Sequence, residues 1–149
     1  STPVIDAEAE RDNTAAGARK AETARAARPL AEAKQHAWDR VVSDDTLSNT
    51  VGRAVIAGFA RPGQEHLLEP FVGKYFESVA DVWKRRSSEV AQSVVIGLYP
   101  QWAIDDDALS QADDFLAGDH PPALRRLVLE GKDTVERSLR IRRADRGED

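Results

Sequence analysis

The side chains that most often bind metals or act as acids and bases are present in this chain, but they are not spaced for that chemistry. Its three histidines, His36, His66 and His120, lie far apart, and no pair has the spacing of a zinc-binding helix. His66 and Glu69 can share a helix face, but two ligands do not make a zinc site. The aspartates at 105–107 lack the glycine and the final glutamate of a calcium-binding loop. We therefore expect no catalytic residue, no metal site and no cofactor within this chain, which also has no cysteine.

Two clusters of basic residues are the strongest candidates for a binding role. They are Lys84-Arg85-Arg86, at the end of a predicted helix, and Arg125-Arg126, near the start of another. Cations at a helix C-terminus are favoured by the helix dipole, and an exposed helix face is often charged, so both clusters have a purely structural interpretation. The alternative is that they point into a concave surface and attract the carboxylates of a peptide.

Composition and charge restrict the possible partners. The 149 residues carry a formal net charge of −5, which argues against nucleic acid and against an anionic membrane as the main partner, since both select for positive charge. The length suits one domain spanning 1–149, and 41% hydrophobic residues suffice for a buried core. Because the chain has no long apolar run and its start does not resemble a signal peptide, we expect a cytoplasmic protein.

The elements that position these residues are predicted to be helices throughout. Apolar residues recur at steps of three and four, and no segment shows the alternation of a strand. The best pattern is in 67–98, where two apolar stripes with a possible cap at Ser87 or Ser88 predict a tight antiparallel helix pair. In all we expect about eight helices, near 3–12, 14–28, 29–42, 46–60, 67–86, 88–98, 106–117 and 121–144.

The predicted fold class is all-α, a curved stack of antiparallel helix pairs of the HEAT-like α-solenoid kind. Several boundaries rest on specific residues. Asn13-Thr14 offers a cap that would divide the first 28 residues into two helices, and Asp45 or Thr46 offers a cap for the fourth helix. Pro29 suits the first turn of a helix, and Arg61-Pro62-Gly63 predicts a turn.

Three longer phrases resemble a known family. They are AWDRVVSDDTLSN at 37–49, GFARPGQEHLLEPFVGKYFESVADVWKRRSSEVAQ at 58–92 and DHPPALRRLVLEGKDTVERSLRIRRAD at 119–145. Together they are similar to the C-terminal helical domain of the M1 zinc metallopeptidases, in the form that bacterial aminopeptidase N has. The resemblance covers nearly the whole chain.

The resemblance implies that the catalytic apparatus lies elsewhere, on a catalytic domain of the same polypeptide. The family's HExxH zinc motif and its GxMEN substrate motif are both missing from this sequence. The chain alone is therefore expected to be inactive, as a C-terminal fragment of a zinc aminopeptidase that covers the catalytic domain and controls the access of peptide substrates. The family pattern assigns no individual contact residues. The alternative is a free-standing solenoid that binds a peptide or protein on its concave face.

Overall fold

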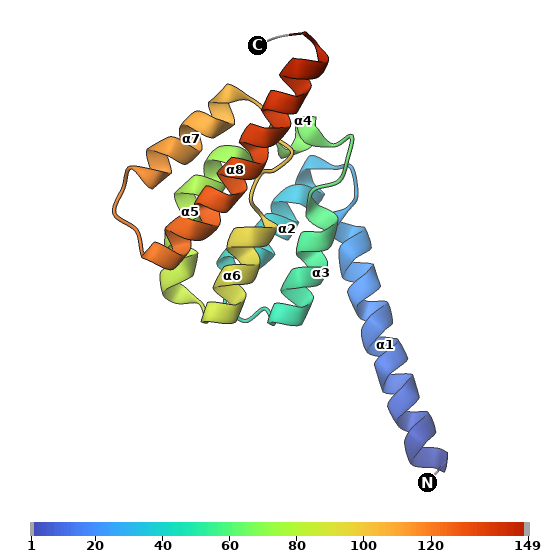
Figure 1. The fold of residues 1–149 in the computed structure, drawn as a ribbon. Helices are drawn as coiled ribbons and strands as arrows, with labels where there is room; N and C mark the ends of the chain where they lie inside the picture. Colours follow the sequence, from blue (N-terminus) through green and yellow to red (C-terminus); the bar gives the residue numbers. More distant parts are fainter. Residues whose placement is uncertain (1, 148–149) are drawn as a thin grey trace.

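The computed structural model describes the backbone of residues 2–147 and the side chains of residues 7–147. Within that part of the chain the regular structure consists of eight α-helices and no strand (Figure 1). Their bounds are α1 Thr2–Ala26, α2 Ala31–Ser43, α3 Asn49–Phe59, α4 Glu65–Leu68, α5 Phe71–Arg85, α6 Ser88–Gly97, α7 Asp106–Leu116 and α8 Pro122–Asp145. The all-α prediction is confirmed.

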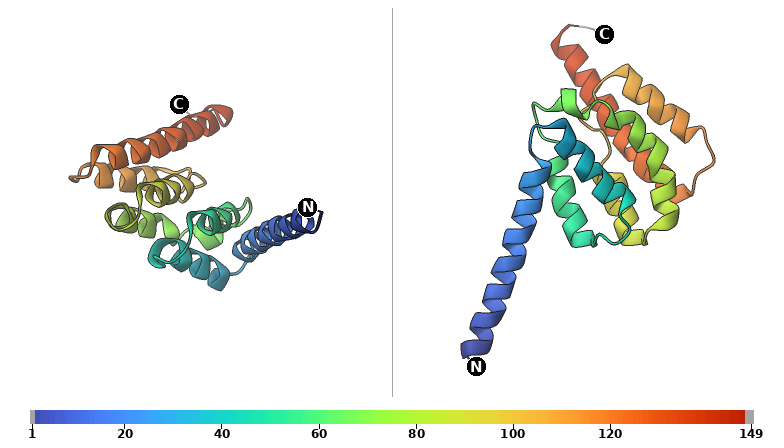
Figure 2. Two further views of the ribbon diagram at one scale, coloured as in Figure 1. Left: turned by 90° about the horizontal axis from the view of Figure 1, so that it is seen from below. Right: turned by 180° about the vertical axis from the view of Figure 1, so that it is seen from behind.

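The helices form a curved stack of two layers. Helices α1, α3, α6 and α8 follow one another along the inner side of the curve, and α2, α5 and α7 back them on the outer side, with α2 on α3, α5 on α6 and α7 on α8. The left view of Figure 2 looks along the layers and shows the curve opening between α8 and α1. The first half of α1 projects beyond the stack, and residues 7–15 are exposed on every side of that helix.

The core is built around aromatic rings between the layers. Trp38, Phe59 and Phe71 pack with ring centroids 5.1–5.8 Å apart, and they join α2, α3 and the start of α5. A second group places Tyr75 against Tyr99 at 5.2 Å, and the Tyr75 hydroxyl donates to the Val95 carbonyl at 2.7 Å. That hydrogen bond joins α5 to α6 across the helix pair that the sequence pattern predicted.

The N-terminal boundary prediction was wrong, because α1 is one helix where two were expected. Thr14 does not act as a cap: its Oγ1 donates to the Glu10 carbonyl one turn earlier, at 2.8 Å. A threonine hydroxyl that bonds backward in this way leaves the helix unbroken. The surrounding residues are rich in alanine, the best helix former, so the helix continues to Ala26.

Three other boundaries also differ from the prediction. The long helix expected from residue 67 is divided, because Pro70 has no N–H to continue α4, and α5 starts only at Phe71. The cap of α3 is Ser48, whose Oγ accepts from Val51 N, while Asp44 accepts from Thr46 and forms a turn before the helix. Helix α2 begins at Ala31, two residues after Pro29. The predicted cap at Ser87 is confirmed, and Asp105 caps α7.

Helices α1 and α3 meet in the closest crossing of the stack. Gly58 lies against the backbone of α1, and a Cβ added there would be 2.1 Å from the Thr23 carbonyl oxygen. Thr23 Oγ1 in turn donates to the Ala54 carbonyl of α3 at 2.8 Å. Only a residue without a side chain lets the two backbones approach to this distance.

Lys34 closes this crossing from α2. Its side chain is completely buried, and its Nζ donates to the carbonyls of Ala26 and Phe59, each at 2.8 Å. These are the last residues of α1 and α3, where carbonyl groups have no partner within the helix. Burial of the ammonium, together with the positive charge of Arg61, lowers the pKa of Lys34. One buried cation therefore satisfies the C-termini of two helices.

We predict that Lys34→Met destabilises the fold by about 2–4 kcal/mol, because methionine fills the space but leaves two buried carbonyls without donors. The free energy of unfolding, measured by urea denaturation, tests this. The control is Lys20→Met, which removes an exposed lysine of α1 that has no ion pair in the described part of the chain. Equal stability of the two variants would contradict the assigned role.

We predict opposite effects for alanine at two helical glycines. Gly58→Ala forces α1 and α3 apart and costs about 1–3 kcal/mol, whereas Gly17→Ala, where an added Cβ meets nothing within 4 Å, stabilises α1 by about 0.5–1 kcal/mol. Thermal unfolding of both variants measures the difference. A Gly58→Ala variant as stable as the native chain would show that the crossing has room to adjust.

Candidate functional site

The inner side of the curve carries three adjoining hollows, which we call the concave trough. The first, of about 530 Å³, lies along α1; the second, of about 390 Å³, lies between the α3–α4 loop and α6; the third, of about 470 Å³, lies between α3 and α6. Arg61 lines the first and second, and Ile96 and Gly97 line the second and third, so the trough is continuous. Its remaining residues are Ala16, Arg19, Lys20, Thr23, Ala24, Ala27, Asn49, Arg53, Ile56, Ala57, Ala60, Pro62, Glu65, Glu89, Gln92, Ser93, Tyr99, Gln101 and Trp102.

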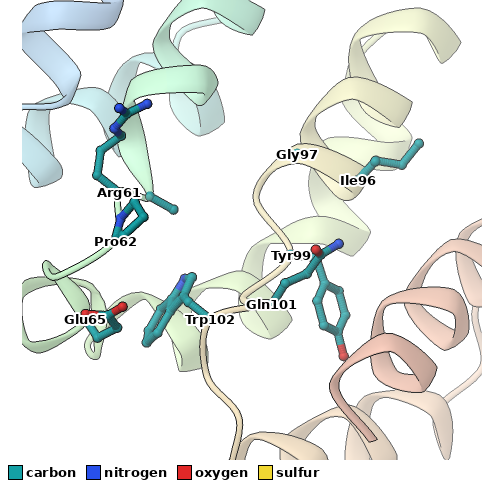
Figure 3. Close-up of a pocket in the computed structure, with 9 residues that line it drawn as sticks. Arg61, Pro62, Glu65, Ile96, Gly97, Tyr99, Gln101 and Trp102 are labelled. Atoms are coloured by element: carbon teal, nitrogen blue, oxygen red, sulfur yellow. The ribbon is translucent and has the colours of Figure 1, made fainter. Parts of the chain in front are cut away.

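The middle hollow has apolar walls with polar groups at its edge (Figure 3). Arg61 and Pro62 stand on one side with the ring of Trp102 below them, and Ile96 stands on the other side. Ile96 is 54% exposed. This surface offers apolar contact to a ligand chain that lies in the trough.

The trough is positively charged although the chain is acidic. Four cationic side chains line it, Arg19, Lys20, Arg53 and Arg61, and none of them has an ion pair within the described residues. Two carboxylates also line the trough, those of Glu65 and Glu89. The Glu89 carboxylate accepts a hydrogen bond from Asn49 Nδ2 at 3.0 Å. Positive groups in a concave surface concentrate the field and attract carboxylates.

The first predicted basic cluster is divided between structural and exposed positions. Arg85 donates to the Val42 carbonyl at 2.8 Å and pairs with Asp45 and Asp81. Arg86, whose side chain is 9% exposed, donates to the carbonyls of Asp44 and Leu47 at 3.1 and 2.9 Å. Both guanidinium groups thus fix the loop between α2 and α3. Lys84 is exposed and has no hydrogen bond with the described residues.

The second cluster is divided in the same way. Arg125 Nη1 donates to the carbonyls of Leu116 and Gly118 at 2.6 and 3.0 Å and so satisfies the C-terminus of α7. Arg126 is exposed and pairs only with Glu130, one turn further along α8. No measurement or contact here tests whether these five residues meet a peptide, so that role stays a prediction.

The structure brings together residues that the sequence pattern did not single out. Arg53 and Arg61 belong to different segments, and neither lies in a run of basic residues that would have marked it. Lys34 carried one signal: it falls one turn before Ala37 and Trp38, on the apolar face of α2. Within residues 7–147 no three histidine or acidic side chains are grouped closely enough to hold a metal ion.

The fold is an all-α curved stack, and comparison with known proteins shows the family to which it belongs. The profile of the ERAP1-like C-terminal domain family matches residues 2–137, and the chain belongs to this family. It is 51% identical over 142 residues to aminopeptidase N of Streptomyces lividans. That alignment covers 95% of this chain and 17% of the relative, so the chain corresponds to a C-terminal domain of an aminopeptidase N and spans about a sixth of the relative's length.

The helices of the described part do not include one that is both long and apolar enough to cross a bilayer. The two longest, α1 and α8, are charged along their length.

We predict that substitutions within the basic cluster at the end of α5 differ in their effect on the free energy of unfolding. Arg86→Ala removes donors from two carbonyls and costs about 1–3 kcal/mol, while Lys84→Ala changes the free energy of unfolding by less than about 0.5 kcal/mol. Urea denaturation of the two variants makes the comparison. If Arg86→Ala unfolds at the same urea concentration as Lys84→Ala, the hydrogen bonds to the α2–α3 loop do not stabilise the fold.

Proposed function

We propose that this chain is the non-catalytic C-terminal domain of a zinc-dependent aminopeptidase of the M1 type, and that it covers the catalytic domain and controls the access of peptides to it. The observation that carries the proposal is the continuous trough on the inner side of the stack, with its unpaired cations. Family membership supports the placement in an aminopeptidase. The zinc and its ligands belong to the catalytic domain under this proposal, and no step of the chemistry passes through the residues of this chain.

The trough acts on peptides through charge and shape. Arg53 and Arg61 attract acidic side chains or the terminal carboxylate of a peptide, because a guanidinium presents a planar fork that matches a carboxylate. Ile96 and Trp102 contact the apolar side chains of the same peptide. These contacts bind substrate and transition state alike, so they act mainly on KM and on the choice between long and short substrates.

The five basic residues predicted from the sequence differ in how readily they can contact a peptide under this proposal. Lys84 and Arg126 keep their charges exposed, and each could meet a passing peptide without loss of a structural contact. Arg85, Arg86 and Arg125 hold backbone carbonyls, so a peptide would have to compete with those bonds. A cytoplasmic location stays a prediction from the sequence.

The test uses the full-length aminopeptidase that contains this chain. We predict that Arg53→Ala with Arg61→Ala lowers kcat/KM for an acidic octapeptide about tenfold, the loss of roughly 1.4 kcal/mol of binding. The same variant leaves kcat/KM for an aminoacyl p-nitroanilide unchanged, because this small substrate does not reach the trough. A neutral octapeptide should lie between the two.

The matched control is Arg140→Ala, an exposed cation of α8 that belongs neither to the trough nor to the two basic clusters. It should keep the native preference among the three substrates. An equal loss for all three substrates, or no loss for any of them, would refute the proposed role of the trough.

A further inference from the structure

A smaller cleft lies between α1 and α2, separate from the trough. It has a volume of about 110 Å³, and its floor consists of Ala26, Ala33, Ala37 and Val55. The alanine side chains from α1 and α2 are small, so they leave space between the helices that larger side chains would fill. The α1 residues of this cleft adjoin those that line the trough, since Glu22 follows Arg19 by three residues.

The rim of the cleft carries an excess of positive charge. Arg25, Arg28 and Arg40 line it, with Glu22 as the single carboxylate and His36 as a further nitrogen group. Three guanidinium groups against one carboxylate leave two positive charges uncompensated, in a chain whose net charge is −5. Nothing in the proposed function uses these groups.

The carboxylate is already occupied by two of the three arginines. Glu22 Oε1 accepts from Arg25 Nη2 at 2.8 Å, and Oε2 accepts from Arg40. The hydrogen bond from Arg40 and the charges of both arginines lower the pKa of Glu22. The side chains of Arg28 and His36 are exposed and make no hydrogen bond with the described residues. The cleft therefore has hydrogen-bond donors without an acceptor, and no second carboxylate lines it.

We propose that this cleft binds a phosphate group, either inorganic phosphate or a small phosphomonoester. The two uncompensated charges match a dianion, and arginine forks match phosphate oxygens in pairs. The volume is enough for a few water-sized groups, which suits one phosphate. Arg40 is only 26% exposed, so its attraction is screened less than that of a surface arginine.

A bound phosphate would bridge α2 and the end of α1. Arg40 belongs to α2, Arg25 to the last turn of α1, and Arg28 to the turn that joins them. A ligand held by all three stabilises the packed arrangement over any state in which the two helices separate. The stabilisation follows mass action and grows with phosphate concentration above the Kd.

The experiment titrates the 149-residue chain with inorganic phosphate at constant ionic strength, with sodium chloride as the balancing salt. Isothermal calorimetry gives the Kd, and thermal unfolding gives the rise in Tm. We expect saturable binding that chloride does not reproduce. Glycerol phosphate in a parallel titration separates the two sources: equal affinity assigns the site to phosphomonoesters, and binding of the free ion alone assigns it to inorganic phosphate.

Two variants should move the affinity in opposite directions. Arg28→Gln, which breaks no contact within the described residues, should weaken phosphate binding at least about tenfold. Glu22→Gln removes the competing carboxylate and should tighten it several-fold, where a merely structural role of Glu22 would loosen it. Circular dichroism confirms that each variant is folded, and Arg28→Gln decides the matter alone if Glu22→Gln is not.

The matched control is Arg53→Gln, another unpaired arginine, which lies in the trough. It should bind phosphate as the native chain does. The proposal is overturned if phosphate binds no better than chloride, if acetate binds as tightly as phosphate, or if Arg53→Gln and Arg28→Gln lose affinity equally.

Discussion

The buried ammonium of Lys34 is the interaction on which the arrangement of the first three helices depends. It donates to the final residues of α1 and α3, where the negative ends of two helix dipoles meet. Removing a cation from water is costly, and the lowered pKa of Lys34 reflects that cost. The cost is offset because two buried carbonyls gain a charged donor and the crossing at Gly58 stays closed. The direction in which α1 leaves the stack is fixed at this point.

The distribution of charge explains how an acidic chain presents a cationic trough. Many of its acidic groups are engaged in structural contacts: Asp105 caps α7, Asp113 pairs with Lys132, and Asp106 pairs with Arg143. Several cations of the inner layer, by contrast, have no such partner among the described residues. Net charge alone indicated that nucleic acid is a poor partner, but it could not show that the positive groups gather on one face.

The sequence predicted the fold class because periodicity and caps are local. The stripes of α5 and α6 and the cap at Ser87 followed from a few neighbouring residues, and the structure agrees. Asn13-Thr14 misled because a threonine that caps a helix and one that bonds backward within it look identical in sequence. The trough and the phosphate cleft could not be found in this way, since each combines residues of helices that are apart in the sequence and meet only in the folded chain. The burial of Lys34 came closest to being predictable from the sequence, because a lysine on the apolar face of a helix needs a hydrogen-bond partner.

The position of α1 connects the two faces of the molecule. Arg19 and Lys20 of this helix line the trough, and Glu22 and Arg25, on an adjoining stripe, line the cleft. A ligand in the cleft that binds only when α1 is packed on α2 must, by linkage, favour the same placement of the trough wall. The coupling can be no larger than the difference in affinity between the packed and the loosened states. Lys34 already holds the C-terminal end of α1, where the cleft lies, so this difference is small.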